Sequence, residues 1–166
     1  MPANYILGKD GKFYVNDPDS GTYLFGAAGA SPDYSTPALL NAANAFIVNG
    51  NCRDVTLTTD TDEVDITTRS TGGFKATVAT LKGSTIEFEA IWKPGDAAFA
   101  FLKEAWEDSK EIAIMAMDGN FDTSGSEGLI GNFTVPGFSR SEPIGDVMKV
   151  NVTLKGSSYL KWYTAA

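Results

Sequence analysis

Alternation of apolar and polar residues through the middle of this chain is the feature that most restricts its fold. Residues 84–90 read Ser-Thr-Ile-Glu-Phe-Glu-Ala, and residues 147–154 have the same two-residue period. A period of two sends successive side chains to opposite faces of a β-strand. We therefore expect Ile86 and Phe88 to be buried and Glu87 to face solvent.

The same kind of pattern along the rest of the chain predicts a mainly β fold, an antiparallel β-sandwich or barrel with one flanking α-helix. The expected strands are Phe46–Leu57, Val64–Thr68, Phe74–Leu81, Thr85–Trp92, Glu111–Met117, Leu129–Val135 and Val147–Leu154. An acidic tight turn at Asp60–Glu63 is expected to join the first two strands. Lys82-Gly83 is expected to be the turn of the next pair.

A helix is expected over 96–108, after the break at Lys93-Pro94-Gly95. Asp96 suits the N-cap position, where its carboxylate can accept a hydrogen bond from a free backbone amide. Phe99, Leu102 and Trp106 recur at helical spacing, so all three are expected to pack against the sheet.

Three segments are expected along the chain. Residues 1–50 are predicted to form an N-terminal arm with a hairpin, residues 51–156 the β-sandwich domain, and residues 157–166 a C-terminal tail. The N-terminal segment 1–50 has few large apolar residues for its length, and the C-terminal tail is rich in them. Both segments are expected to become ordered on association, and the domain between them is expected to fold without either.

The chemistry available to the chain is restricted by its composition. It has no histidine, and its one cysteine, Cys52, excludes an intrachain disulfide. Asp118–Asp122 fits the start of a calcium loop, but Thr123 and Leu129 stand where glycine and glutamate are needed. We expect no catalytic, cofactor-binding or metal-binding residue. A hydrolase with two carboxylates ranks last among the alternatives.

The charge balance restricts the partners of the chain. Thirteen basic residues against 21 acidic ones give a net charge of −8, which opposes binding to nucleic acid phosphates. No apolar run approaches the roughly 20 residues of a membrane-spanning helix, so no membrane is expected as a partner.

The block from Cys52 to Lys155 resembles the major tail tube proteins of long non-contractile-tailed bacteriophages and their prophage relatives. The resemblance is carried, in order along the chain, by Arg53–Leu57, Glu63–Arg69, Gly72-Gly73-Phe74, Thr80–Lys82, Ile86–Glu89, Asp96–Ala105, Gly137–Pro143 and Val150–Lys155. It implies a structural subunit rather than an enzyme, without cofactors, that forms hexameric rings stacked head to tail into a tube. The expected partners are further copies of the chain and other tail proteins.

The resemblance also implies a location in the virion tail, after assembly in the host cytoplasm, and a channel through which DNA passes without specific binding. Related tube proteins often carry a long insert in an early hairpin, whereas Asp60–Glu63 reads here as a tight turn. The N-terminal segment 1–50 and the C-terminal tail are therefore expected to supply the contacts between rings. The candidate inter-subunit residues are Tyr5, Phe13, Tyr14, Tyr23, Phe25, Tyr159, Leu160, Trp162 and Tyr163. Asp60, Asp62 and Glu63 are candidates for an acidic lumen or ring edge.

Two other functions remain open at this point. The first is the inner tube of a contractile injection machine or secretion system, which shares the fold. The second is a carbohydrate-binding β-sandwich module, which would need an exposed tryptophan as a stacking platform. Trp92 and Trp106 fall on faces expected to be buried, so Trp162 would have to serve.

Overall fold

One antiparallel sheet organises the molecule. The structure is a computed structural model that describes residues 10–16, 25 and 46–165. Within these residues seven strands lie in the order β2-β1-β5-β6-β7-β4-β3, and the sheet is not closed into a barrel. The elements are β1 (Lys12–Val15), β2 (Ile47–Val48), β3 (Cys52–Asp65), the 3-10 turn η3 (Arg69–Thr71), β4 (Thr77–Ile91), α2 (Ala97–Glu107), β5 (Ile112–Met117), β6 (Glu127–Ser141) and β7 (Lys149–Thr164). The expected mainly β antiparallel fold with a flanking helix is confirmed.

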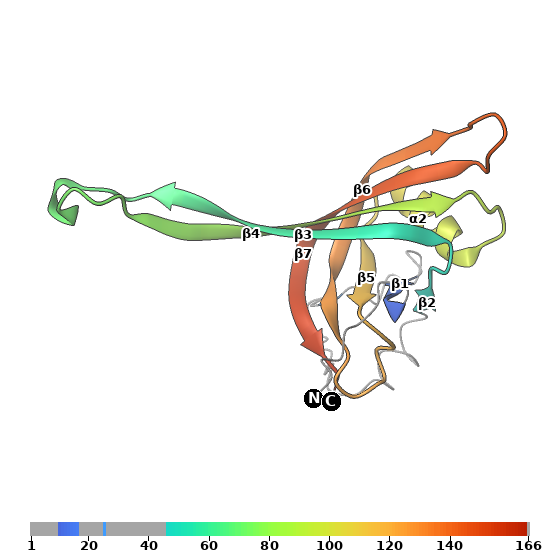
Figure 1. Ribbon diagram of the computed structural model, residues 1–166, viewed down its shortest axis with the longest axis horizontal. Coiled ribbons are helices and arrows are strands. Elements are labelled where there is room, and N and C mark those ends of the chain that lie inside the picture. Colours follow the sequence, from blue (N-terminus) through green and yellow to red (C-terminus); the bar gives the residue numbers. More distant parts are fainter. Residues whose placement is uncertain (1–9, 17–24, 26–45, 166) are drawn as a thin grey trace.

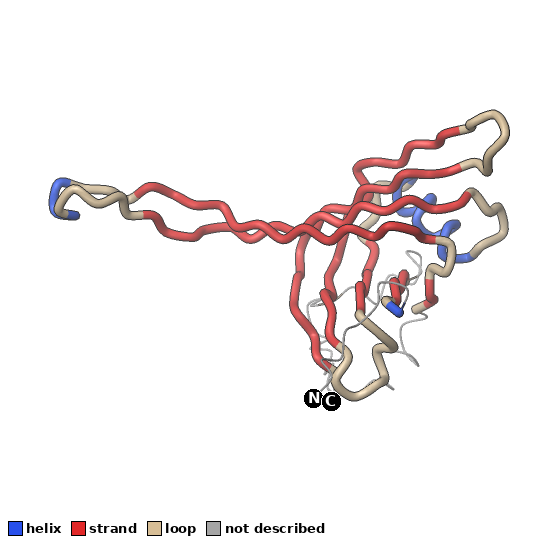
Figure 2. Tube along the Cα trace, in the orientation of Figure 1, coloured by secondary structure: helices blue, strands red, loops and turns tan. Residues whose placement is uncertain are grey.

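The main correction concerns β3 and β4, which continue past the rest of the sheet as a long two-stranded arm (Figures 1 and 2). We call residues 58–83 the arm, which is a different segment from the N-terminal arm expected over residues 1–50. The tight turn expected at Asp60–Glu63 is wrong, because these residues lie inside β3 and pair with β4. The turn expected at Lys82-Gly83 is wrong as well. Gly83 lies opposite Asp60 in the ladder, and a Cβ at Gly83 would come within 2.7 Å of the Asp60 carboxylate.

The real turn lies at the far end of the arm. Gly72 caps the end of η3 with a φ of 64°, and Gly73 follows with a φ of 86°. Positive φ values are strained for residues with a Cβ, so two successive glycines suit this position. The amide of Ile66 donates to the carbonyl of Ala76 at 2.9 Å and closes the hairpin.

The helix is confirmed, with one change to its buried face. The amide of Ala98 donates to the Asp96 carboxylate at 3.0 Å, which satisfies one of the free donors at the start of α2. Phe99 and Leu102 are buried against the sheet, whereas Trp106 is 46% exposed. Trp106 lies at the margin of the apolar stripe, where its ring stacks on Phe138 with 6.1 Å between centroids.

The core has two parts on opposite faces of β5 and β6. Ile112 and Ile114 face the part that contains Phe99 and Leu102 of α2. The alternate β5 residues, including Met115, face a second cluster that contains Tyr14, Phe25, Phe46 and Tyr163. Because β5 is covered on both faces, it reads as a continuous apolar run rather than as an alternating strand.

The residues expected as a separate C-terminal tail are the second half of β7. Residues 160–164 pair with Glu127–Gly131 of β6, and Tyr163 is 6% exposed. The four large apolar residues near the end of the chain therefore belong to a strand of the subunit's own sheet. A tail that pairs and packs in this way contributes to the fold of the subunit itself.

Asn132 of β6 fixes Phe25 in the second cluster. Its Oδ1 accepts from the Phe25 amide at 2.8 Å, and its Nδ2 donates to the Phe25 carbonyl at 2.7 Å. The Nδ2 also donates to the Ser158 hydroxyl at 3.0 Å. Asn132 is 1% exposed, so these bonds replace water at buried polar groups.

We expect Asn132→Ala to lower the free energy of unfolding by about 2–4 kcal/mol, because it removes the partners of a buried amide and a buried carbonyl. Chemical denaturation measures this change. Asn151→Ala, at an exposed position of β7 in the same sheet, is the matched control and should change stability by less than about 0.5 kcal/mol. Equal effects of the two substitutions would contradict the role given to Asn132.

Candidate assembly surfaces

The arm exposes apolar side chains together with acidic ones. Val64 and Val78 lie opposite each other, 50% and 46% exposed, and Ile66 continues the same face at 49%. Asp60, Glu63 and Asp65 are also exposed. A register shift interrupts the ladder between Thr61 and Glu63.

The physical effect of this register shift follows from the two-residue period of a strand. The pairs Thr61–Lys82 and Glu63–Ala79 set two steps of β3 against three steps of β4, so the extra residue lies in β4. β3 itself keeps its alternation. Asp60, Val64 and Ile66 therefore lie on one face of the arm, together with Val78, and Glu63 and Asp65 lie on the other.

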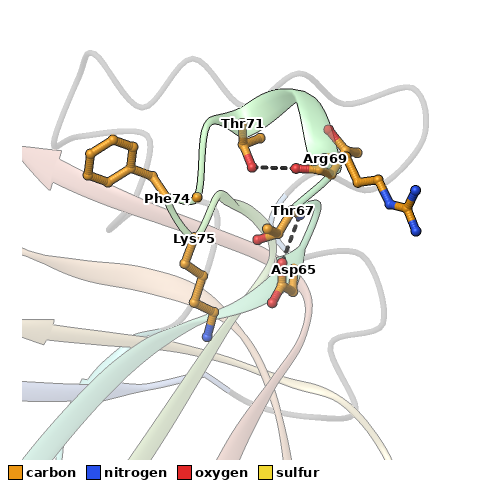
Figure 3. A pocket seen from close by; sticks show the side chains of 8 residues that line it. Asp65, Thr67, Arg69, Thr71, Phe74 and Lys75 are labelled. Carbon is orange, nitrogen blue, oxygen red and sulfur yellow. Dashed lines mark hydrogen bonds between the residues drawn. The ribbon is translucent and has the colours of Figure 1, made fainter.

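The far end of the arm, residues 66–76, is called the tip. It contains Arg69 and Lys75 and no acidic residue. Phe74, beside Lys75, is 79% exposed, and Figure 3 shows the side chains of Arg69 and Phe74 extending away from the loop. Within the described residues, neither Arg69 nor Lys75 forms an ion pair.

The tip is held in shape by its own hydrogen bonds. The Thr71 hydroxyl donates to the Thr68 carbonyl at 2.6 Å, and the Ala76 amide donates to the Thr67 hydroxyl at 2.9 Å. Hydrogen bonds from the Thr67 side chain and amide to the Asp65 carboxylate lower the pKa of Asp65, so this group stays ionised at neutral pH. The tip therefore presents its cations on an ordered turn.

Four strands, β6, β7, β4 and β3, form a part of the sheet with two free edges. β3 is the last strand of the sheet. β5 pairs with β6 over Gly128–Phe133, so the segment Phe138–Ser141 of β6 has β7 beside it and no other described strand. Free edges present unpaired backbone donors and acceptors and can pair with another chain.

The open face of these four strands is polar. Ile86 and Val152 are buried on one side, whereas the intervening Glu87 and Thr153 lie opposite each other on the other side. The exposed or half-exposed side chains of the open face include Arg53, Thr56, Thr58, Asp60, Thr85, Glu87, Glu89, Lys149, Asn151, Thr153, Lys155, Ser139 and Ser141, and one apolar residue, Ile91. Its charges balance in number, and Lys149 pairs with Glu89 at 3.6 Å.

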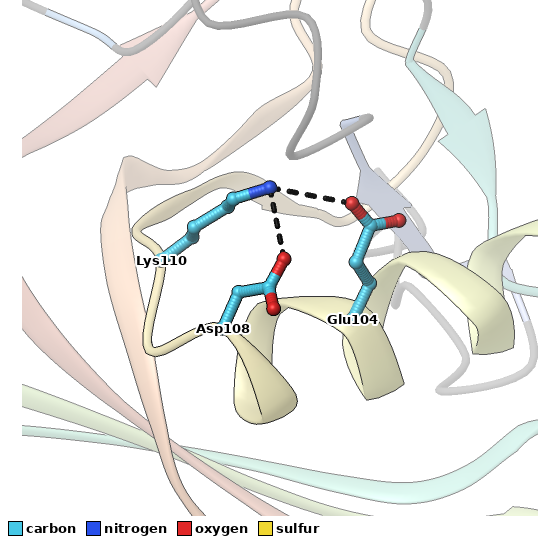
Figure 4. Close-up of polar contacts among 3 residues, drawn as sticks. All are labelled: Glu104, Asp108 and Lys110. Carbon is cyan, nitrogen blue, oxygen red and sulfur yellow. Dashed lines mark hydrogen bonds and ion pairs between the residues drawn. The ribbon is translucent and has the colours of Figure 1, made fainter.

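A further exposed surface lies at the end of α2. Lys110 bridges Glu104 at 3.5 Å and Asp108 at 3.0 Å (Figure 4), and Lys103 pairs with Glu107 at 3.5 Å. We call Trp106, Glu107, Asp108 and Phe138 the α2 surface. Residues 103–111 hold four acidic groups against two lysines, so this surface is acidic beside an exposed tryptophan.

The predicted contact residues fall into four groups. Phe13, Tyr14, Phe25 and Tyr163 are buried within the subunit, and burial raises the pKa of the Tyr14 and Tyr163 hydroxyls. Tyr159 and Leu160 are half-buried, while Trp162 is 60% exposed. Tyr5 and Tyr23 lie outside the described residues. Contact of any of these nine residues with a neighbouring subunit stays a prediction.

Asp60, Asp62 and Glu63 are exposed on β3, in the arm rather than in a turn. Sequence reasoning missed Phe74 and Leu81, which are 79% and 73% exposed on the arm. The signal that could have found them is Gly72-Gly73. Once this pair is taken as the turn, Phe74 follows directly at a hairpin tip.

The titratable groups do not gather into a reactive centre. Burial raises the pKa of the Cys52 thiol, which keeps it protonated, and Cys52 Sγ lies 3.0 Å from the Asn49 carbonyl. The described residues contain no group of three or more side chains placed to hold a metal ion. No helix among them is long and apolar enough to span a membrane.

Comparison with known proteins gives a family and a fold. A family model described as "Phage tail tube protein" matches residues 35–161. No curated protein sequence matches the chain.

Three solved structures with a similar fold are distant from this chain in sequence. A chain of the SPP1 tail tube is 12% identical with a TM-score of 0.67, and the match covers 96% of this chain and 80% of that chain. A chain from the tail of an empty gene transfer agent particle, refined with C6 symmetry, is 14% identical with a TM-score of 0.62, covering 75% and 91%. A chain of the anti-feeding prophage baseplate is 10% identical with a TM-score of 0.53, covering 99% and 97%.

Proposed function

Because this chain belongs to the phage tail tube protein family and is a structural protein of the virion tail, we propose that six copies form a ring and that rings stack into the tube through which the genome passes. The observation that supports this best is the four-stranded part of the sheet with a free edge on each side. One heterologous contact, repeated around an axis, closes a ring when the rotation between copies divides a full turn.

The ring contact would join the two free edges. β3 of one subunit pairs with the Phe138–Ser141 segment of β6 in its neighbour, so the four strands of each copy continue into one sheet around a channel. Pairing satisfies the backbone groups that each edge leaves open. The buried face and α2 then lie outside, and the polar face lies inside.

The channel wall would suit the passage of DNA without specific binding. Threonine, serine and asparagine side chains cover the open face, and its charges balance in number. Binding of DNA to a protein wall depends on an excess of cations that release counterions from the phosphates. A wall without this excess, in a chain of net charge −8, holds the phosphate backbone weakly.

The stacking contact would come from the arm. The subunit carries the long early hairpin that the sequence reading did not find, and no residue from 58 to 82 is buried within its own subunit. Exposed apolar side chains on a projecting hairpin are typical of a contact made on assembly. The subunit performs no reaction in this proposal and needs no cofactor. Further copies of itself and other tail proteins are its partners.

Negative-stain electron microscopy of concentrated protein, together with sedimentation velocity, tests the proposal. We expect rings or tubes, with an assembled fraction that rises with concentration. A monomer at every concentration, together with an absence of tubes from induced cells, would contradict it.

The inner tube of a contractile machine is the second candidate. The fold likeness to the anti-feeding prophage baseplate chain, which extends over nearly the whole chain, favours it. Recovery of a sheath protein around tubes purified from cells would select this candidate. Bare tubes from the same preparation would select a non-contractile tail.

A further inference from the structure

We infer that the tip of one subunit docks on the α2 surface of a second copy of this chain in the next ring. This inference rests on the proposed stacking of rings and assigns the two surfaces that make the contact. The tip supplies Arg69, Phe74 and Lys75. The α2 surface supplies Trp106, Phe138 and the carboxylates of Glu107 and Asp108.

The position of the two surfaces is the first argument. The arm reaches one end of the molecule's longest axis, and α2 lies near the other end (Figure 1). In a head-to-tail polymer a patch at one end of each copy binds a different patch at the opposite end of the next copy. Copies stacked along this axis therefore bring the tip of one close to the α2 end of the next.

Charge is the second argument. The tip carries two cations, no acidic residue and, within the described residues, no ion pair. Residues 103–111 carry two more acidic than basic groups. Lys103 pairs with Glu107, and Lys110 pairs with Glu104 and Asp108, so this segment keeps an acidic excess beside exposed ion pairs. Arg140, the cation near Phe138 in the sequence, pairs with Glu142. The two surfaces thus have opposite charge, as partner surfaces require.

Exposed aromatic rings are the third argument. Phe74 is 79% exposed and Trp106 is 46% exposed. Trp106 is exposed although Leu102, one turn before it in α2, is buried. Tryptophan, tyrosine and arginine are the residues that most often carry the energy of a protein interface. Docking would cover Phe74 and Trp106 together while Arg69 and Lys75 meet Glu107 and Asp108.

Charge reversal in the full-length protein tests the contact. R69E/K75E and E107K/D108K should each lower the mass of sedimentable tubes about tenfold, because like charges then face each other. The fourfold variant R69E/K75E/E107K/D108K restores opposite charges and should return the tube mass to within about twofold of wild type. An equimolar mixture of the two double variants should also form tubes, with the two kinds of ring alternating.

The control is K93E/K161E, which makes the same change in net charge as R69E/K75E at two exposed lysines outside the tip, the α2 surface and the open face. It should keep the tip-to-α2 contact, and circular dichroism should show all variants folded. Tubes of normal mass from either double variant would overturn the inference while leaving the proposed function standing. A failure of the fourfold variant to recover would also overturn it.

Two other outcomes separate this inference from its alternatives. Tubes absent from the wild-type protein itself would contradict the proposed function rather than the assignment of the two surfaces. Retention of DNA by wild-type protein in a gel-shift assay, lost in R69E/K75E while tubes persist, would assign the tip to DNA and overturn docking on a second copy.

Discussion

Removal of the arm should leave a folded subunit that forms rings but no tubes. In the variant, residues 60–83 are replaced by Asn-Gly, so that Thr59 and Ser84, which already face each other, flank a two-residue hairpin turn. No residue from 58 to 82 is buried, so the core loses nothing and the melting temperature should change by only a few degrees. Electron microscopy should show single rings in place of tubes.

The retained part of β3 makes this result specific. Cys52–Thr59 still offers a free edge, so the contact that closes a ring is preserved while the contact between rings is lost. Tubes of normal length from the shortened protein would remove stacking from the arm. Loss of rings as well as tubes, with the fold intact, would show that the arm acts in ring closure.

Truncation after Gly156 should prevent folding. It removes the strand that pairs with Glu127–Gly131 and exposes Leu129 and Ile130, which are 3% and 0% exposed. It also removes Tyr163 from the second core cluster. The loss of several buried side chains and a ladder of backbone bonds exceeds about 5 kcal/mol, comparable to the whole stability of a small domain. Near-ultraviolet circular dichroism should show no fixed tertiary packing.

Two neighbouring point variants give this prediction its matched control. Tyr163→Ala should lower the free energy of unfolding by about 3 kcal/mol, whereas Trp162→Ala should lower it by less than about 1 kcal/mol, because Tyr163 is 6% exposed and Trp162 is 60% exposed. A stable, cooperatively melting protein that ends at Gly156 would restore the view of these residues as a dispensable tail.

Much of the fold follows from local pattern. The alternation around Ile86 and Phe88 predicts one buried face, and the structure confirms it. Asp96 and the stripe through Phe99 and Leu102 predict α2 correctly, because capping and helical spacing are local properties.

Trp106 departs from this pattern because the stripe is wider than the surface that the sheet offers. Spacing fixes which side of a helix a residue occupies, but not how far the partner surface reaches.

The arm was missed because its sequence lacks the signal that a half-buried strand gives. Residues 58–65 are threonines and carboxylates with one valine, and a run of this kind is typical of a loop. β-Branched threonine nevertheless favours extended backbone, and the ladder to β4 supplies the hydrogen bonds. The sequence predicts a tail at Tyr159–Tyr163 because Gly156-Ser157-Ser158 interrupts the alternation. In the structure β7 continues through this break with a shift in register between Gly131 and Phe133 of β6.

Because the arm has no buried residues, its backbone amides should exchange with solvent at different rates in the free subunit and in the tube. Amide hydrogens exchange with solvent when a hydrogen bond opens, and opening is easiest where no side-chain packing holds the strands together. The amides of Thr58–Asp65 and Thr77–Lys82 should therefore exchange fast in the monomer, while those of β5, covered on both faces, exchange slowly. Docking on a neighbour should slow exchange in the arm and leave β5 unchanged, so part of the binding free energy is spent on fixing a hairpin. The first contact between two rings is therefore weakened by this ordering, whereas later contacts form on copies whose arms are already fixed.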